Sequence, residues 1–268
     1  MRKLRDDLDP VGLSRDLWKE IAEMLAVTAL LRGGTPAQKE TLLPAIAGGD
    51  LLIAVATDKS LRHAPYQIST RCTGKYQLSG RKLHVLDGPV ADRLIVSARS
   101  SGDTGSCDGI SLFLVDPKAN GVTVIRNAMV DSRNSTTVEL RDVVVSEADV
   151  IGTFDKGAIV LDAVLDAGRA VLSAELLGVA EEAFERTLTY LRDRDQFGVK
   201  IGTFQALQHR AAHLFCEIEL VRSVALRTLQ ALDAQEPIAS SLVCRPRKLS
   251  AISSIKPTGS RSWQGISK

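Results

Sequence analysis

The sequence predicts an α+β protein: a partial N-terminal helical segment, a middle antiparallel β-sandwich or β-barrel domain, and an incomplete C-terminal antiparallel helical bundle. From residue 51 to about 145, short apolar runs alternate with period two and are separated by Gly, Asn and Asp. From residue 158 to 233, apolar residues recur at helical spacing. The expected domains are a helical remnant (1–48), the β-domain (49–150), the C-terminal helical domain (151–236) and a basic tail containing Ser and Pro, expected to be disordered (237–268).

Two short helices are expected before the β-domain. Residues 14–26 fit an amphipathic helix with Ser14 at its N-cap. Thr35 can cap a second helix that has Pro36 at its first position, and Gly48-Gly49 can end it.

The middle domain is predicted from eight short strands. Their separators include Gly74, Gly80, Asp87-Gly88 and Asn120-Gly121, residues that favour turns. Short antiparallel strands at this spacing are typical of a sandwich or a barrel. The candidate strands are Leu51–Ala56, Gln67–Thr73, Lys75–Leu78, Lys82–Leu86, Arg93–Ala98, Ile110–Asp116, Val122–Arg126 and Thr136–Val145.

Two long helices are expected at residues 158–192 and 203–233, packed antiparallel. Phe197-Gly198 between them resembles a helix stop with Gly near the C-cap. A bundle normally uses more than two helices, so oligomerisation could complete this domain.

Composition excludes several classes of function. No window approaches the run of about 18 apolar residues that a membrane span needs, and the first ten residues lack the apolar core of a secretory signal. The four cysteines are scattered without a C-x-x-C pair, so neither a metal site nor a disulfide framework is expected, and a cytoplasmic location is the default. Of the 34 Lys and Arg residues, six follow Pro237, where there is no Asp or Glu. Residues 1–236 thus hold 28 basic (34 − 6) against 32 acidic residues, which gives nucleic-acid binding little support.

The most specific stretch of the sequence is residues 190–212. Arg194 and Gln205 flank the corner between the two long helices, where a planar cation and an amide could meet an anionic ligand. Taken alone, these residues also fit a plain helix–turn–helix with a polar corner. The pattern R-x-Q-F-G, two residues, Ile, two residues, F-Q, two residues, Q-H resembles the C-terminal helical domain of the acyl-CoA dehydrogenases. The pattern G-T-x-x-Q-K-x-x-x-L-P-x-I-x-x-G, which begins at Gly34, resembles the entry to that family's middle domain, and the resemblance covers about residues 14–236.

The resemblance implies FAD-dependent α,β-desaturation of an acyl-CoA thioester, with electrons passed to an acceptor protein. It also implies a homo- or hetero-oligomer, because the family arginine matched by Arg194 reaches the FAD phosphates across a subunit interface. Asp166 and Arg169 match a D-x-x-R that contacts the acyl-CoA, although an i,i+3 surface ion pair is the alternative. The residues matched to the cofactor are Arg194, Gln196, Phe197, Gln205 and Thr57, with a solvated arginine, a core aromatic and surface amides as the alternatives.

The sequence also departs from the family, and no catalytic residue is assigned. Some branched-chain members place their catalytic glutamate directly before the arginine matched by Arg169, where this sequence has Gly168. Asp58-Lys59 follows Thr57 where T-E-P is common, and His84 lies near the expected flavin face. Compared with the family, we expect an N-terminal helical domain that is internally shortened and a C-terminus that is truncated or frame-altered. Two other interpretations therefore stay open: a non-catalytic partner subunit that completes a shared FAD site, and a decayed gene product.

Overall fold

The computed structural model describes residues 23–57, 64–74, 76–129 and 134–236, together with Ala239 and Leu242. The chain divides into two compact units, Met1–Gly168 and Arg169–Lys268, which we describe separately. The predictions for residues 14–22, for Asp58 and Lys59, and for most of the tail lie outside the described residues. Within the described tail, Ala239 and Leu242 are helical and pack with Ala231.

Helices precede the sheet, as predicted. Residues 23–33 are helical, so the predicted end of the first helix at residue 26 is wrong. The helix continues because Ala29 and Leu30 are fully buried, and it ends at the Gly33-Gly34 pair. The second helix, α2 (Pro36–Ala47), has the predicted Thr35 cap and ends at Gly48. The Gln38 backbone N–H donates to Thr35 Oγ1 (3.2 Å) and the Thr35 N–H donates to Gln38 Oε1 (2.9 Å), a reciprocal capping box.

The first unit is built on one eight-stranded sheet in the order β6-β7-β3-β2-β4-β5-β8, with β1 also paired to β4. Seven of the strands correspond to the predicted runs. The sheet is mostly antiparallel, but β1 and β2 run parallel to β4, and no closed barrel forms among the described residues. The strands are β1 (Ile53–Ala56), β2 (Arg71–Thr73), β3 (Gln77–Leu86), β4 (Arg93–Arg99), β5 (Ile110–Val115), β6 (Val122–Asn127), β7 (Ser135–Val144) and β8 (Val150–Ile151), with a 3-10 turn, η1 (Glu147–Asp149), before the last.

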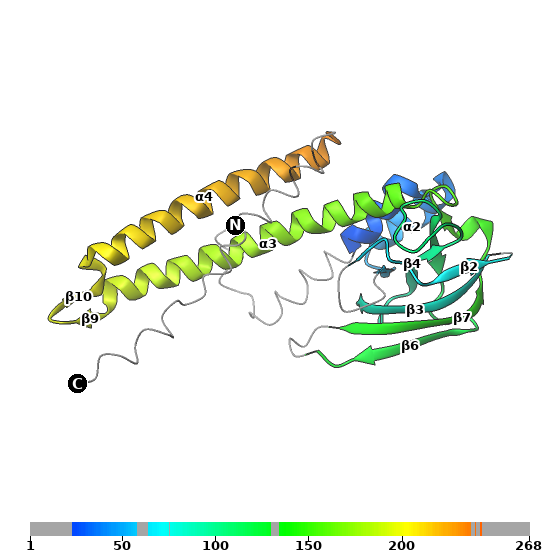
Figure 1. The fold of residues 1–268 in the computed structure, drawn as a ribbon, viewed down its shortest axis with the longest axis horizontal. Coiled ribbons are helices and arrows are strands. Elements are labelled where there is room, and N and C mark those ends of the chain that lie inside the picture. Colours follow the sequence, from blue (N-terminus) through cyan, green and yellow to red (C-terminus); the bar gives the residue numbers. More distant parts are fainter. Residues whose placement is uncertain are drawn as a thin grey trace. The chain divides into compact units, whose positions relative to one another are not determined.

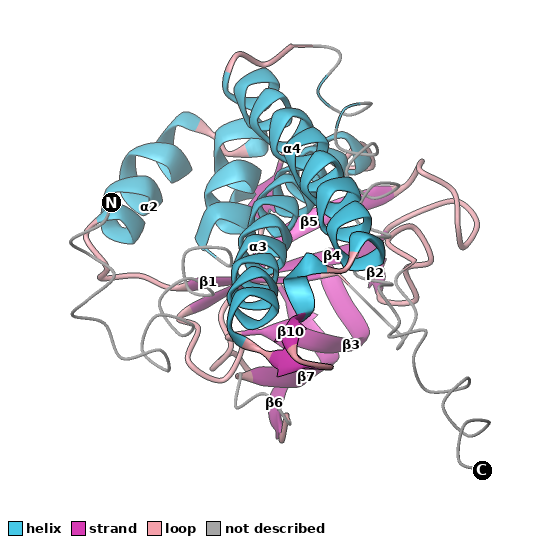
Figure 2. Cartoon of the chain, turned by 90° about the vertical axis from the view of Figure 1, so that its left-hand side faces the viewer, coloured by secondary structure: helices cyan, strands magenta, loops and turns pink. Residues whose placement is uncertain are grey.

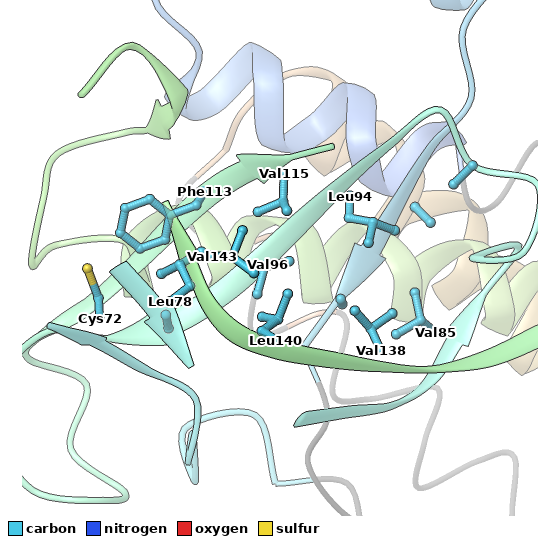
Figure 3. Close-up of a cluster of buried hydrophobic side chains, with 14 of the residues drawn as sticks. Cys72, Leu78, Val85, Leu94, Val96, Phe113, Val115, Val138, Leu140 and Val143 are labelled. Carbon is cyan, nitrogen blue, oxygen red and sulfur yellow. The ribbon is translucent and has the colours of Figure 1, made fainter. Parts of the chain in front are cut away.

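The central strands bury both faces. One face encloses an apolar cluster that draws on β2, β3, β4, β5 and β7, among them Leu78, Val96 and Phe113 (Figure 3). The alternate residues of β4 and β5, such as Ile95 and Leu112, pack against residues 26–30, α2 and the start of α3 (Ala158–Asp193). Figure 2 shows these helices beside the strands. The period-two pattern thus arises because successive side chains enter different clusters.

Gly80 was predicted to separate two strands, and this prediction is wrong, because β3 runs through it. Its φ is +151°, and a Cβ at this position would lie 2.6 Å from Thr70 Cα. The glycine therefore allows a close approach of two backbone segments rather than a turn. The sequence also gave no sign of β8, which is only two residues long.

The second unit contains most of α3 and all of α4 (Gln205–Asp233), which run side by side in opposite directions as predicted (Figure 1). The Phe184 and Phe215 ring centroids are 6.5 Å apart, and Arg222 pairs with Glu181 at 2.9 Å. From the first pair to the second, the position on α3 moves back along the chain while that on α4 moves forward, as antiparallel helices require. Among the described helices, none has the length and apolar character that crossing a membrane requires.

Candidate cofactor-binding residues

The corner between α3 and α4 is a small β-hairpin. Strands β9 (Asp195–Gln196) and β10 (Val199–Lys200) pair antiparallel, and the 3-10 turn η2 (Ile201–Thr203) leads into α4. The turn residues Phe197 and Gly198 both have positive φ, +56° and +77°, the signature of a type I′ hairpin turn. The prediction that Phe197-Gly198 caps a helix is therefore wrong, because α3 has already ended at Asp193.

The hairpin backbone is held by several hydrogen bonds. The Ile201 N–H donates to the Arg194 carbonyl at 3.0 Å. Lys200 Nζ donates to the Asp193 carbonyl at 3.0 Å and to an Asp195 carboxylate oxygen at 2.7 Å. The pairing of β9 with β10 and the hydrogen bonds of Lys200 hold this backbone in one conformation. The Cα positions of the side chains that project from it are therefore defined.

The structure brings four of the predicted cofactor residues to this one corner: Arg194, Gln196, Phe197 and Gln205. All four are exposed, and Phe197 retains 87% of its accessible surface. Within the described residues, the Arg194 guanidinium and the two amides make no hydrogen bond or ion pair. The Phe197 ring meets the Phe204 ring edge-on, with centroids 6.2 Å apart. A guanidinium, two amides and an aromatic face are thus available to a ligand.

Thr57 belongs to the first unit. It is half-buried and directly follows β1. Its carbonyl accepts a hydrogen bond from Lys82 Nζ at 3.0 Å. Sequence reasoning missed Lys82, because a lysine in a half-exposed strand is normally a surface residue.

Asp166 and Arg169 lie one turn apart on α3. Asp166 is only 8% exposed and Arg169 is half-buried, so the carboxylate is not that of a solvated surface pair. Gly168 lies between them, and a Cβ there would meet Leu25 Cδ2 at 2.9 Å. His84 is exposed, and its φ of +53° falls at a register shift between β3 and β7.

Comparison with known proteins supports the resemblance. Residues 155–261 match the family described as "Acyl-CoA dehydrogenase, C-terminal domain". The chain is 32% identical over 207 residues to a 2-methylacyl-CoA dehydrogenase from Solanum tuberosum, which covers 74% of this chain and 50% of the relative. A short/branched chain specific acyl-CoA dehydrogenase from Bos taurus is 26% identical over 266 residues, which covers 97% of this chain and 61% of the relative.

Among solved structures, "PigA with FAD and proline" has a TM-score of 0.80 at 23% identity, covering 88% of this chain and 63% of that one. The fold and the sequence matches define the class: the chain belongs to the acyl-CoA dehydrogenase family. It spans about half the length of the first curated relatives that it matches.

Proposed function

We propose that this chain is an acyl-CoA dehydrogenase-like flavoprotein that takes part in the FAD-dependent α,β-desaturation of an acyl-CoA thioester. The observation that carries the proposal is the corner at residues 194–205. There a short paired hairpin and the start of α4 present Arg194, Gln196, Phe197 and Gln205 to solvent, with no described partner for the guanidinium or the amides. These are residue types suited to a diphosphate and a planar ring system.

The residues present fit FAD. The Arg194 guanidinium can donate two parallel hydrogen bonds to a diphosphate. The Gln196 and Gln205 amides can donate to phosphate or ring oxygens, and Phe197 offers an apolar face to a ring. Thr57, in the first unit, would contact the edge of the isoalloxazine.

The bound cofactor would supply the acceptor for the hydride that leaves the β-carbon. In this chain, Asp166 and Arg169 would contact the acyl-CoA near the reacting end. Abstraction of the α-proton needs a general base near that carbon, and no residue of this chain is assigned that role. The finer expectations, an electron-acceptor protein, a homo- or hetero-oligomer and a cytoplasmic location, belong to this proposal as well.

The first test is the visible absorption spectrum of the purified chain after incubation with FAD and gel filtration. We expect flavin bands in the parent protein. Replacing Arg194 with methionine should weaken FAD binding by about tenfold to a hundredfold, because a charge-assisted hydrogen bond contributes roughly 1.5–3 kcal/mol. Arg192→Met is the matched control, since Arg192 is an exposed arginine in the last turn of α3. Equal losses in both variants would count against the assignment.

The exposure of the corner favours a second candidate, a partner subunit that completes a flavin site shared with another chain. Under this hypothesis the isolated chain is folded but colourless, and FAD is retained only after mixing with a complete family member. Size-exclusion chromatography with absorbance detection separates the two cases. Stoichiometric FAD on the chain alone would exclude the partner hypothesis.

Gly168 offers a test of catalytic competence. The atom that a new Cβ would meet, Leu25 Cδ2, is the end of a flexible side chain, so a larger residue can be admitted. In a chain that binds FAD and acyl-CoA, Gly168→Glu should raise α-proton exchange of the thioester by about 100-fold, the usual contribution of a general base. Gly168→Gln is the control of equal size. Equal exchange in the two variants would show that residue 168 does not face the α-carbon.

A further inference from the structure

One of the largest fully buried side chains among the described residues is that of a lysine, Lys82 on β3. Its relative exposure is 0%, although lysine is almost never fully buried without a partner. Burial of an ammonium group is costly unless hydrogen bonds compensate for the lost water. Lys82 Nζ donates to Ser97 Oγ at 2.8 Å and to the Thr57 carbonyl at 3.0 Å.

Ser97 and Thr57 lie near the point along β4 where its paired strand changes from β1 to β2. The pairing of β1 with β4 ends at Ala56↔Val96, and β2 takes over at Arg71↔Arg99. Within the described residues, Ser97 and Ala98 have no strand partner on this side of β4. The Lys82 side chain comes from β3, on the other side of the short β2, and its ammonium group joins the end of β1 to β4.

The hydrogen bond from Lys82 affects the backbone of Thr57 in particular. Among the described residues, Ala56 is the last residue of β1 with a strand partner. Directly after it, the Thr57 carbonyl accepts a hydrogen bond from Lys82 Nζ. A charge-assisted hydrogen bond inside a protein is stronger than a neutral one, and here it limits rotation of the backbone that carries the Thr57 hydroxyl.

The strand is irregular directly after this lysine. The register of β3 against β7 shifts between Lys82 and Val85, and His84 within that shift has a φ of +53°. Because of the extra residue, Lys82 and Val85 are both buried although they are three positions apart, and His84 is exposed. The bulge therefore lets the lysine point inward without displacing the apolar residue that follows.

We propose that Lys82 is a positioning residue for flavin binding: by holding the Thr57 peptide at the end of β1, it sets where the Thr57 hydroxyl meets the ring. This inference rests on the proposed function, because Thr57 is its link to the cofactor. Lys82 itself is buried and acts through Thr57.

The test compares the full-length parent with Lys82→Met, which keeps the length of the side chain and removes the charge. Lys118→Met, at an exposed lysine of the same unit, is the control. Two readouts are needed: hydrogen–deuterium exchange of residues 52–57 in the FAD-free protein, and the affinity and absorption spectrum of added FAD. We expect exchange at this segment to rise by about tenfold in Lys82→Met, since one charge-assisted hydrogen bond is lost. FAD affinity should fall by a similar factor with a shift of the flavin bands, and Lys118→Met should change neither.

The outcomes separate the two proposals. A parent that binds no FAD contradicts the proposed function of the isolated chain, and unchanged exchange at residues 52–57 in Lys82→Met overturns the lysine inference in any case. Faster exchange with unaltered FAD affinity and spectrum also overturns it, because the lysine would then be purely structural. If Lys82→Met does not fold, Ser97→Ala takes its place, since it removes one acceptor and leaves the lysine. It should raise exchange at residues 52–57 and weaken FAD binding by about threefold, and no change in either readout contradicts the inference.

Discussion

The two units of this chain differ in how completely they bury their large apolar side chains. The first unit encloses Phe113, Leu78 and Ile95 almost completely, in clusters on both faces of its sheet. The second unit leaves large apolar side chains exposed on α3 and α4, including Val179 (61%) and Leu220 (57%). The first unit therefore has a well-enclosed core, whereas the second unit buries few large apolar side chains among its described residues, Ile218 and Val221 being two of them.

The candidate cofactor residues divide in the same way. Thr57 is held from within by a buried lysine, but Arg194 and Phe197 project from a hairpin into solvent. A group that buried contacts already hold in place loses little conformational entropy when a ligand binds. Exposed side chains lose more, because the ligand itself must order them. We expect variants of the two units to differ accordingly, with the largest effect in the buried core of the first unit.

Phe113→Ala should destabilise the first unit by about 3–5 kcal/mol, because it removes a fully buried aromatic side chain and leaves a cavity. Phe215→Ala in the second unit removes a ring that is 53% exposed and should cost about 1 kcal/mol or less. Urea denaturation followed by circular dichroism gives both free energies of unfolding. Similar losses of unfolding free energy in Phe113→Ala and Phe215→Ala would contradict the contrast between the units.

Gly80→Ala should lower the free energy of unfolding by about 1–3 kcal/mol, because φ is +151° and the new Cβ would lie 2.6 Å from the Thr70 backbone. Gly178→Ala is the control: it lies within α3, and a Cβ there would meet nothing within 4 Å. Alanine favours a helix, so this variant should be slightly stabilising. Thermal unfolding of the two variants measures the difference.

Cys72 and Cys216 should differ in reactivity towards iodoacetamide. Burial raises the pKa of the Cys72 thiol, and nearby Asp155 raises it further, whereas Cys216 is exposed. Because the thiolate is the reacting form, we expect Cys72 to react about tenfold or more slowly at neutral pH. Peptide mass spectrometry gives the two rates.

The same raised pKa has a consequence for stability. A thiol whose pKa is higher in the folded than in the unfolded state contributes stability that is fully present below the unfolded pKa. This contribution is lost as the pH rises from the ordinary thiol value of 9.0 through the folded pKa. In Cys72→Ala this part of the alkaline pH dependence should be absent. Equal alkylation of both cysteines in the native protein would show that the first unit opens readily.

The smallest effect is expected for Glu181→Gln, which breaks the ion pair with Arg222 between α3 and α4. Side chains of this pair are 37% and 51% exposed. Solvated pairs contribute about 0–1 kcal/mol, and less at high salt. Unfolding of this variant at low and high ionic strength measures the change, and a loss several times larger would mean that the helix pair depends on this contact.

Much of the fold follows from local patterns in the sequence. Strands β4, β5 and β6 were predicted to within one residue at each end, because alternation depends only on neighbouring residues and the face they enter. The Thr35 cap was predicted for the same reason, since its partner Gln38 is three residues away. The family was also recognisable, because its pattern in residues 190–212 lies within one short stretch.

The errors have physical causes. Phe197-Gly198 was placed at a helix end because glycine is common near helix C-caps. A type I′ turn was not expected there, because a phenylalanine with positive φ is uncommon. Gly80 was assigned to a turn because the close approach of Thr70, which explains the glycine, comes from a separate segment.

The sequence by itself determined the order of the long helices and of most strands, and the family. Only the tertiary structure decided that Lys82 points inward to hold Thr57, that β3 continues through Gly80, and that the corner residues share one exposed hairpin. Hydrophobic periodicity and helix caps depend on residues only a few positions apart, so they are visible in the sequence. The partners of Lys82 lie 25 and 15 positions away, and such contacts exist only after the sheet has brought separate strands together.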